Sequence, residues 1–211
     1  MVPVKVRAKG SNTLLSTYAF LDGGSNTIFC SDQLLKDLGV RVVDTTLSLT
    51  TMERENSIKA SSLVQFEVFD LDENNFIELP LVFSTPELPI SSEGVPRQED
   101  VDRWPHLKGI HIAEIDAHVG LQIGHNVPKP LEPKEVKESQ DGGPYATRSL
   151  IGLAINAPLG RNGNTTRTTN FTGRDAKLDH TFSVSPRSSS CGNLPMTQRS
   201  RKLFPPPSSA H

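Results

Sequence analysis

The chain has 211 residues and a formal net charge of −2, which is enough for one domain or for one domain with a tail. Its two cysteines, Cys30 and Cys191, exclude a disulfide framework or a cysteine-rich metal site. No apolar stretch approaches membrane-spanning length and the N-terminus lacks the apolar core of a signal peptide, so we expect an intracellular, cytoplasmic protein without membrane contact.

The first residues alternate apolar and polar side chains in the manner of β-strands. Residues 2–8 predict a first strand, and residues 14–21 predict a second strand that runs directly into Asp22. A carboxylate at the end of a buried strand is costly unless something stabilises it, and the two glycines after Asp22 allow backbone N–H groups to approach it. Asp22 is therefore a candidate for chemistry. The alternative is an ordinary Asp-Gly turn between two strands.

A short strand at residues 28–30 and a short helix follow. Cys30 ends an apolar run, and we expect a small buried thiol there, not a nucleophile. Ser31 is a suitable helix N-cap, apolar residues follow at helical spacing, and Gly39 is a suitable end. Three later segments are rich in β-branched or aromatic residues and predict strands, the last two joined by a hairpin turn: residues 45–51, 62–70 and 76–84.

The next part of the chain is richer in proline. Residues 85–110 predict a long connection with a short acidic helix near residues 98–104. Trp104 is expected to anchor this connection to the body of the protein, not to bind a ligand. The remaining predicted elements are core strands at residues 110–115 and 119–123, a turn at 135–139 and a final strand at 147–157.

Two motifs in this β-rich pattern resemble those of a known family. The run Phe20-Leu21-Asp22-Gly23-Gly24-Ser25 resembles the active-site loop of retropepsin-like aspartic proteases, in which two apolar residues precede Asp-Thr/Ser-Gly-Ala/Ser. The run VGLQIGHN at residues 119–126 resembles the second hallmark of that fold, an apolar strand ending in Ile-Gly-x-Asn/Asp. Residues 97–106 and 141–147 are similar to the peptidase domain in polyproteins of BEL/Pao-type LTR retrotransposons. The resemblance covers about residues 1–160.

The resemblance implies an all-β fold, a single retropepsin-like lobe with one or two short helices. It also implies an aspartic endopeptidase of retroelement origin that cleaves a peptide or polyprotein with a water activated between two aspartates. One lobe supplies one aspartate, so a homodimer is required, and no cofactor or metal is expected. The implied site comprises catalytic Asp22, the loop residues Gly23, Gly24 and Ser25, structural support from Gly124 and Asn126, and a candidate flap at Thr51, Met52, Glu53 and Arg54.

Gly23 departs from the family pattern, which has Thr or Ser at this position. In the family that hydroxyl braces the opposite loop across the dimer. Its loss removes two hydrogen bonds of about 0.5–1.5 kcal/mol each, and glycine adds about 1 kcal/mol of backbone entropy per loop. The alternative function is therefore a catalytically inactive lobe that serves as a binding or interaction module. The candidate flap also has an alternative, an ordinary hairpin tip, because it lacks a glycine-rich tip.

Two further features of the sequence bear on possible function, a group of histidines and a basic C-terminal segment. His106, His111, His118 and His125 lie close together in the chain, but their spacing matches no common zinc pattern. Residues 162–211 carry 7 Lys/Arg against 2 Asp/Glu and are rich in Ser, Thr, Asn and Pro. We therefore predict a domain at residues 1–160 and a disordered basic tail at 161–211. The tail's charge favours weak contact with nucleic acid, and a solvated tail without a partner is the alternative.

Overall fold

The computed structural model describes residues 1–50, 55–90, 92–156, 159 and 175–177. Within these residues the protein is mainly β, as the sequence predicts, with two short α-helices. None of the helices in the described part is long and apolar enough to cross a bilayer.

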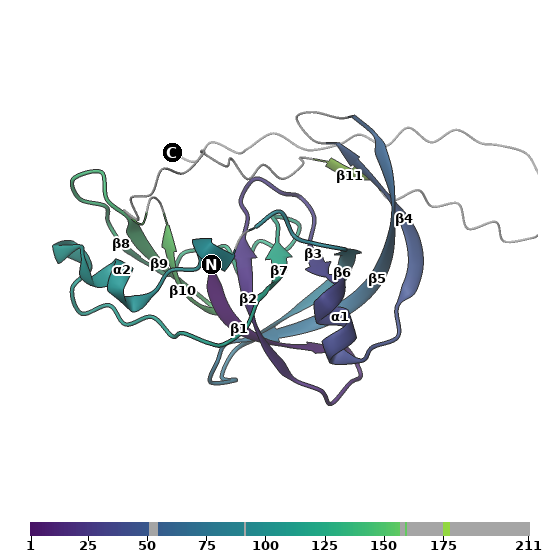
Figure 1. The fold of residues 1–211 in the computed structure, drawn as a ribbon, viewed down its shortest axis with the longest axis horizontal. Coiled ribbons are helices and arrows are strands. Elements are labelled where there is room, and N and C mark those ends of the chain that lie inside the picture. The colour runs from purple at the N-terminus through teal and green to yellow at the C-terminus, as the bar shows by residue number, and fades with distance from the viewer. Residues whose placement is uncertain (51–54, 91, 157–158, 160–174, 178–211) are drawn as a thin grey trace, which may run out of the picture. The chain divides into compact units, whose positions relative to one another are not determined.

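Six strands form a closed barrel (Figure 1): β1 (Val2–Ala8), β2 (Leu15–Leu21), β3 (Phe29–Ser31), β5 (Ser57–Phe69), β6 (Phe76–Thr85) and β7 (Val119–Ile123). Their order is β1-β2-β7-β3-β6-β5, and the pairing of β1 with β5 closes the barrel. Neighbouring strands are antiparallel except β2 with β7 and β3 with β6, which are parallel. The parallel pairing of β2 with β7 brings two segments distant in sequence to the same end of the barrel.

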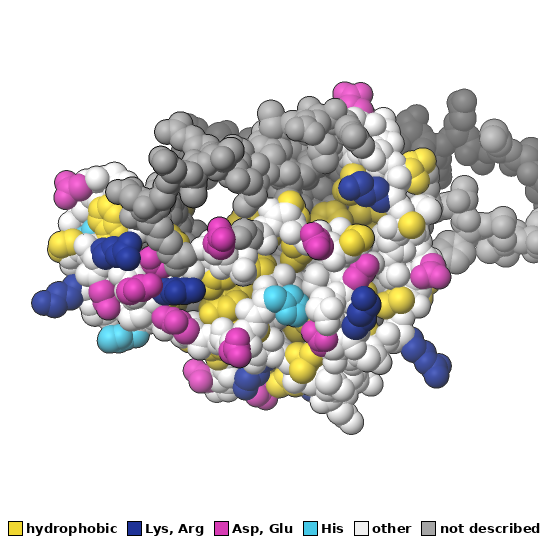
Figure 2. Space-filling model, viewed as in Figure 1, with side chains coloured by type: hydrophobic (Ala, Val, Ile, Leu, Met, Phe, Trp, Pro, Cys, Tyr) yellow, Lys and Arg dark blue, Asp and Glu magenta, His cyan; other side chains and the backbone are white. Residues whose placement is uncertain are grey.

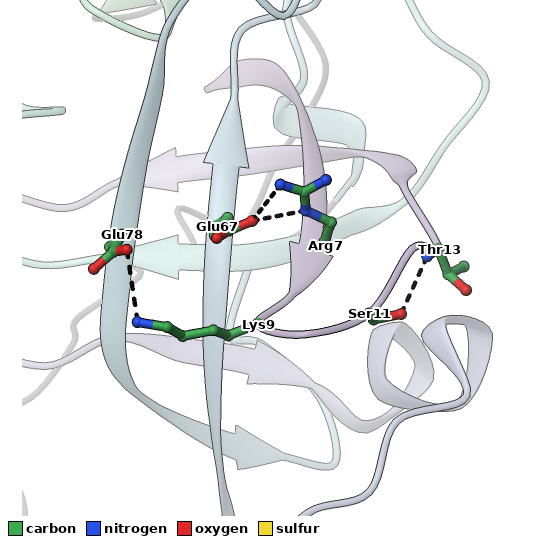
Figure 3. A network of polar contacts seen from close by, with 6 residues as sticks. All are labelled: Arg7, Lys9, Ser11, Thr13, Glu67 and Glu78. Atoms are coloured by element: carbon green, nitrogen blue, oxygen red, sulfur yellow. Dashed lines mark hydrogen bonds and ion pairs between the residues drawn. The ribbon is translucent and has the colours of Figure 1, made fainter.

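The closing pair of strands carries ion pairs on its outer face (Figure 3). Arg7 on β1 faces its register partner Glu67 on β5 at 2.6 Å, and its guanidinium lies 5.0 Å from the ring centre of Phe69. Lys9 reaches Glu78 on β6 at 3.6 Å. The buried side chains of β1 alternate with these outward ones, so a one-residue slip would turn the core face of β1 toward solvent.

Helix α1 (Asp32–Leu38) covers part of the barrel core and forms for the local reasons that the sequence indicates. The Ser31 hydroxyl accepts a hydrogen bond from the Leu34 N–H at 3.2 Å. Gly39 ends the helix in the left-handed conformation, with φ of 61°. The helix buries its three leucines, and the barrel core that receives them includes the inward valines of β1, Phe66, Leu79, Leu121 and Ile123.

A long hairpin extends from the barrel. Strand β4 (Val43–Thr50) pairs with the first half of β5, from Val43 opposite Leu63 to Leu49 opposite Ser57. The candidate flap, Thr51 to Arg54, follows β4 in the sequence and lies outside the described residues. Strand β11 (Asp175–Lys177) pairs with the other edge of β4. The rest of the predicted tail, residues 161–211, lies outside the described residues, so its disorder stays a prediction.

The connection after β6 and a three-stranded second sheet share a small core of their own. The connection contains 3-10 turns at Ser92–Gly94 and Pro105–Leu107 and helix α2 (Gln98–Asp102), and the sheet has the order β10-β9-β8. Its strands are β8 (Glu135–Lys137), β9 (Tyr145–Ser149) and β10 (Gly152–Asn156). Val101 and Leu107 from the connection bury against Ala146 and Ile155 from the sheet, and Trp104 packs against this cluster. The anchoring role predicted for Trp104 is confirmed.

Three sequence predictions in this region are wrong. Residues 110–115 form no strand, and two of their backbone N–H groups bond to side chains instead: Ile112 to Gln98 Oε1 at 3.0 Å and Ile115 to the Tyr18 hydroxyl at 2.9 Å. The turn predicted at 135–139 is strand β8, which pairs with β9. The strand predicted at 147–157 is instead the hairpin of β9 and β10, whose turn ends at Gly152 with φ of 144°.

Candidate active site

Asp22 directly follows β2, at the barrel end where β2 and β7 run parallel. Its backbone N–H donates to the Ile123 carbonyl at 2.9 Å, which extends the pairing of the two strands by one residue. The residue is only 9% exposed. As the sequence predicts, Asp22 is therefore a nearly buried carboxylate at the end of a core strand.

The glycine pair after Asp22 folds the loop back onto the carboxylate. The Gly24 N–H donates to Asp22 Oδ1 at 2.8 Å, and the Ser25 N–H reaches the Asp22 carbonyl at 3.3 Å. The hydroxyl of Ser25, the third predicted loop residue, donates to the Thr27 carbonyl at 3.0 Å and accepts from the Thr27 N–H at 3.2 Å. Ser25 therefore stabilises the loop through hydrogen bonds to another residue of the same loop.

Gly124 packs beneath this loop, as the sequence predicts for a supporting residue. A Cβ at Gly124 would stand 2.6 Å from the Ser25 carbonyl oxygen and would also collide with the Thr27 carbonyl oxygen. The next residue, His125, donates its N–H to the Ser25 carbonyl at 2.7 Å. The loop after β2 and the turn after β7 are thus held together at a distance that only glycine allows. Asn126, the other predicted support, lies exposed in that turn.

Gln122 on β7 is a site residue that the sequence analysis missed. Its side chain is fully buried, and its Nε2 donates to Asp22 Oδ2 at 2.9 Å. Its Oε1 is also buried and has no hydrogen-bond partner, an arrangement that typically costs about 1–3 kcal/mol. A lone polar residue inside the apolar strand VGLQI is the signal that could have found it.

Gly23 is exposed at the tip of the loop. A Cβ there would lie 3.4 Å from Nε2 of His125, which is an ordinary van der Waals contact. Beside Gly23 opens a groove of about 550 Å³ with mainly apolar walls. Its lining includes Phe20, Leu21, Gly23, His125, Val136, Tyr145, Ala154 and Ile155. The carboxylate loop therefore borders a space that can take apolar side chains.

The structure gives no support to metal chemistry in the described part of the chain. There, no group of three or more His, Cys, Asp or Glu side chains comes together in a way that could hold a metal ion. Of the four neighbouring histidines, His106 bonds through Nε2 to the Pro144 carbonyl at 2.8 Å, while His125 lies by the Asp22 loop.

Acidic and basic side chains are mixed over the face of the protein shown in Figure 2.

Cys30 lies in β3, opposite Leu121 of β7, and its side chain is fully buried. Burial raises the pKa of its thiol from 9.0 to about 12, and the nearby Asp32 carboxylate acts in the same direction. A thiol that stays protonated is a poor nucleophile. The prediction that Cys30 is a buried thiol is confirmed.

No protein-family model matches the chain, and no curated protein or solved structure matches it either.

Proposed function

We propose that the protein is a retropepsin-like aspartic endopeptidase that acts as a homodimer. The observation that carries the proposal is the Asp22 carboxylate, nearly buried at the end of two parallel strands, with the Gly24 N–H on its Oδ1. A closed six-stranded barrel and a glycine beneath the loop make this position rigid. Such placement favours chemistry over a solvent-exposed turn.

The proposed mechanism requires two copies of Asp22, one from each protomer. Two carboxyl groups close to one another do not both ionise readily, and they share a proton. The ionised carboxylate takes a proton from a bound water, which attacks the peptide carbonyl carbon, while the protonated carboxyl donates to the carbonyl oxygen. The C–N bond then breaks as the leaving nitrogen takes up a proton, and two shorter peptides leave.

The substrate in this proposal is an extended peptide, such as a segment of a retroelement polyprotein. The groove beside Gly23 has mainly apolar walls, and this supports apolar side chains near the cleaved bond. The flap of this proposal is the segment Thr51 to Arg54, between β4 and β5 in the sequence, which would cover a bound substrate. Intracellular action and weak nucleic-acid contact by the tail remain part of this proposal.

The alternative is an inactive lobe that acts as an interaction module. Two features favour it: Gly23 lacks the hydroxyl that would brace a second loop, and Gln122 already bonds to Asp22 Oδ2 within one chain. In that case Asp22 would serve only to hold the loop together.

The test compares the complete wild-type chain with Asp22→Asn and with Asp116→Asn, the same change at an exposed aspartate. Cleavage of quenched fluorescent peptides with apolar centres is followed from about pH 3.5 to about pH 7, with and without pepstatin. Sedimentation reports the fraction of dimer, and thermal unfolding shows that each variant is folded.

The proposal expects cleavage by wild type and Asp116→Asn, inhibition by pepstatin, and loss of at least about a hundredfold in Asp22→Asn. Equal cleavage by folded Asp22→Asn would assign the activity to a contaminant. No cleavage by wild type at concentrations where it is dimeric would favour the interaction module.

A further inference from the structure

The contact between Gln122 and Asp22 is unusual because of where the glutamine lies. Gln122 sits in the middle of β7, and its register partners on the two flanking strands are Phe20 and Phe29. Paired residues of neighbouring strands share a face of the sheet, so the amide emerges between two phenylalanine positions. An apolar side chain would suit this position better, since a buried amide must find hydrogen bonds to offset its desolvation.

The unpartnered oxygen shows which group orients the amide. Gln122 Nε2 donates to Asp22 Oδ2 at 2.9 Å, whereas Oε1 is buried without a hydrogen-bond partner. A glutamine that belonged to a wider structural network would bond through both ends of its amide. Here the bond to Asp22 alone fixes the orientation of the amide.

We propose that Gln122 is a positioning residue that orients the Asp22 carboxylate. This inference depends on the proposed function for its catalytic meaning, but the contact itself does not. The Gly24 N–H binds Oδ1 and the Gln122 amide binds Oδ2, so a donor on each oxygen fixes the plane of the carboxylate.

The contact joins two elements. Gln122 approaches from β7, and Asp22 directly follows β2, so the bond ties the carboxylate to the neighbouring parallel strand. Removing the Gln122 donor takes this bond away from Oδ2. A carboxylate that can turn should slow the chemical step more than it weakens substrate binding.

The variants are Gln122→Leu, which keeps the size and removes the donor, and Gln122→Asn, which keeps the amide but is one methylene too short to reach. Gln65→Leu, at an exposed position of β5, is the matched control. We expect both Gln122 variants to lower kcat about tenfold and to change KM by less than about twofold. Gln65→Leu should leave both constants unchanged.

A second readout needs no activity. The bond links Gln122 to Asp22, so the effects of removing the two side chains on stability should not add. The change in Tm caused by Gln122→Leu should be more destabilising in wild type than in Asp22→Ala, whereas Gln65→Leu should have the same effect in both backgrounds.

The two readouts separate the two proposals. Cleavage with an unchanged kcat in folded Gln122 variants would overturn the positioning role while leaving the protease intact. If wild type does not cleave, the protease proposal fails and the Tm comparison in the Asp22→Ala background decides the role of Gln122 alone. Should Gln122→Leu not fold, Gln122→Asn and Gln122→Met serve in the same comparison, and equal effects on the Tm in the two backgrounds overturn the inference.

Discussion

The imidazole of His125 lies beside the bare backbone of Gly23, with its Nε2 3.4 Å from the place where a Cβ would stand. The backbone at Gly23 is not in the left-handed region, and His125 is the neighbour that its Cβ would meet. Nothing in this geometry requires a glycine. The missing hydroxyl at the proposed dimer seam is therefore a feature that a single substitution can restore.

Gly23→Thr should strengthen the proposed dimer. The added hydroxyl supplies two hydrogen bonds across the seam, one per protomer, and the side chain reduces the freedom of the loop before association. We expect the dimer dissociation constant, measured by sedimentation, to fall by about tenfold or more. Cleavage at low protein concentration should rise in parallel.

Gly23→Ala is the control for this experiment, because it restricts the backbone without supplying a hydroxyl. If Ala and Thr strengthen association equally, the effect comes from the backbone and not from a bond across the seam. If neither changes association, the loops do not meet in a dimer and the interaction module becomes the better interpretation.

Local signals in the sequence predict the local parts of the fold. Ser31 and Gly39 mark the ends of α1 because capping depends on neighbours within one helical turn. The Asp22 loop is predictable for a similar reason, since its carboxylate bonds to the N–H two residues further on. The closure of the barrel and the position of Gly124 under the loop both depend on contacts between distant segments. The family resemblance led us to expect the position of Gly124 but not the closure of the barrel.

Long-range side-chain contacts explain what the sequence did not predict. The Gln122 amide meets Asp22 across 100 positions of sequence, through the parallel pairing of β2 with β7. Residues 110–115 have a strand-like pattern, but the Tyr18 hydroxyl and the Gln98 side chain take the backbone bonds that a neighbouring strand would have made. No local pattern encodes either arrangement.

Gly124→Ala should destabilise the protein and the loop above it. The new methyl would collide with the carbonyl oxygens of Ser25 and Thr27, so the loop after β2 has to move away from β7. Overpacking of this kind costs about 1–3 kcal/mol, and urea unfolding measures it directly. Gly23→Ala, with an ordinary contact at the same loop, should cost less than about 1 kcal/mol. Equal stability of the two variants would contradict the close packing at Gly124.

Gly143→Ala should disturb the second core through Trp104. A Cβ at Gly143 would stand 2.5 Å from the Cζ3 atom of the indole, so the ring has to shift. Trp104 is the only tryptophan in the chain, so its fluorescence reports this shift alone. We expect a longer emission wavelength and a loss of about 1–3 kcal/mol in unfolding free energy. An unchanged spectrum would show that the indole does not lie against Gly143.

Cys30 should make the folded protein sensitive to alkaline conditions. Burial raises the pKa of its thiol from 9.0 to about 12, so the folded state keeps a proton that the unfolded chain releases at lower pH. This contribution to stability is complete below about pH 9 and is lost as the pH rises from about 9 to about 12. Across that window the unfolding free energy should fall by about 1.4 kcal/mol per pH unit through this thiol.

The measurement compares two proteins that both carry Cys191→Ser, one with Cys30 and one with Cys30→Ala. The Ala variant lacks the titrating thiol, so its unfolding free energy should decline less steeply between about pH 9 and about pH 10.5. At neutral pH a thiol reagent should label Cys30 no faster than the protein opens, because the side chain is fully buried. Rapid labelling in the folded state, or equal alkaline slopes for the two proteins, would show that the thiol is accessible and titrates near its ordinary value.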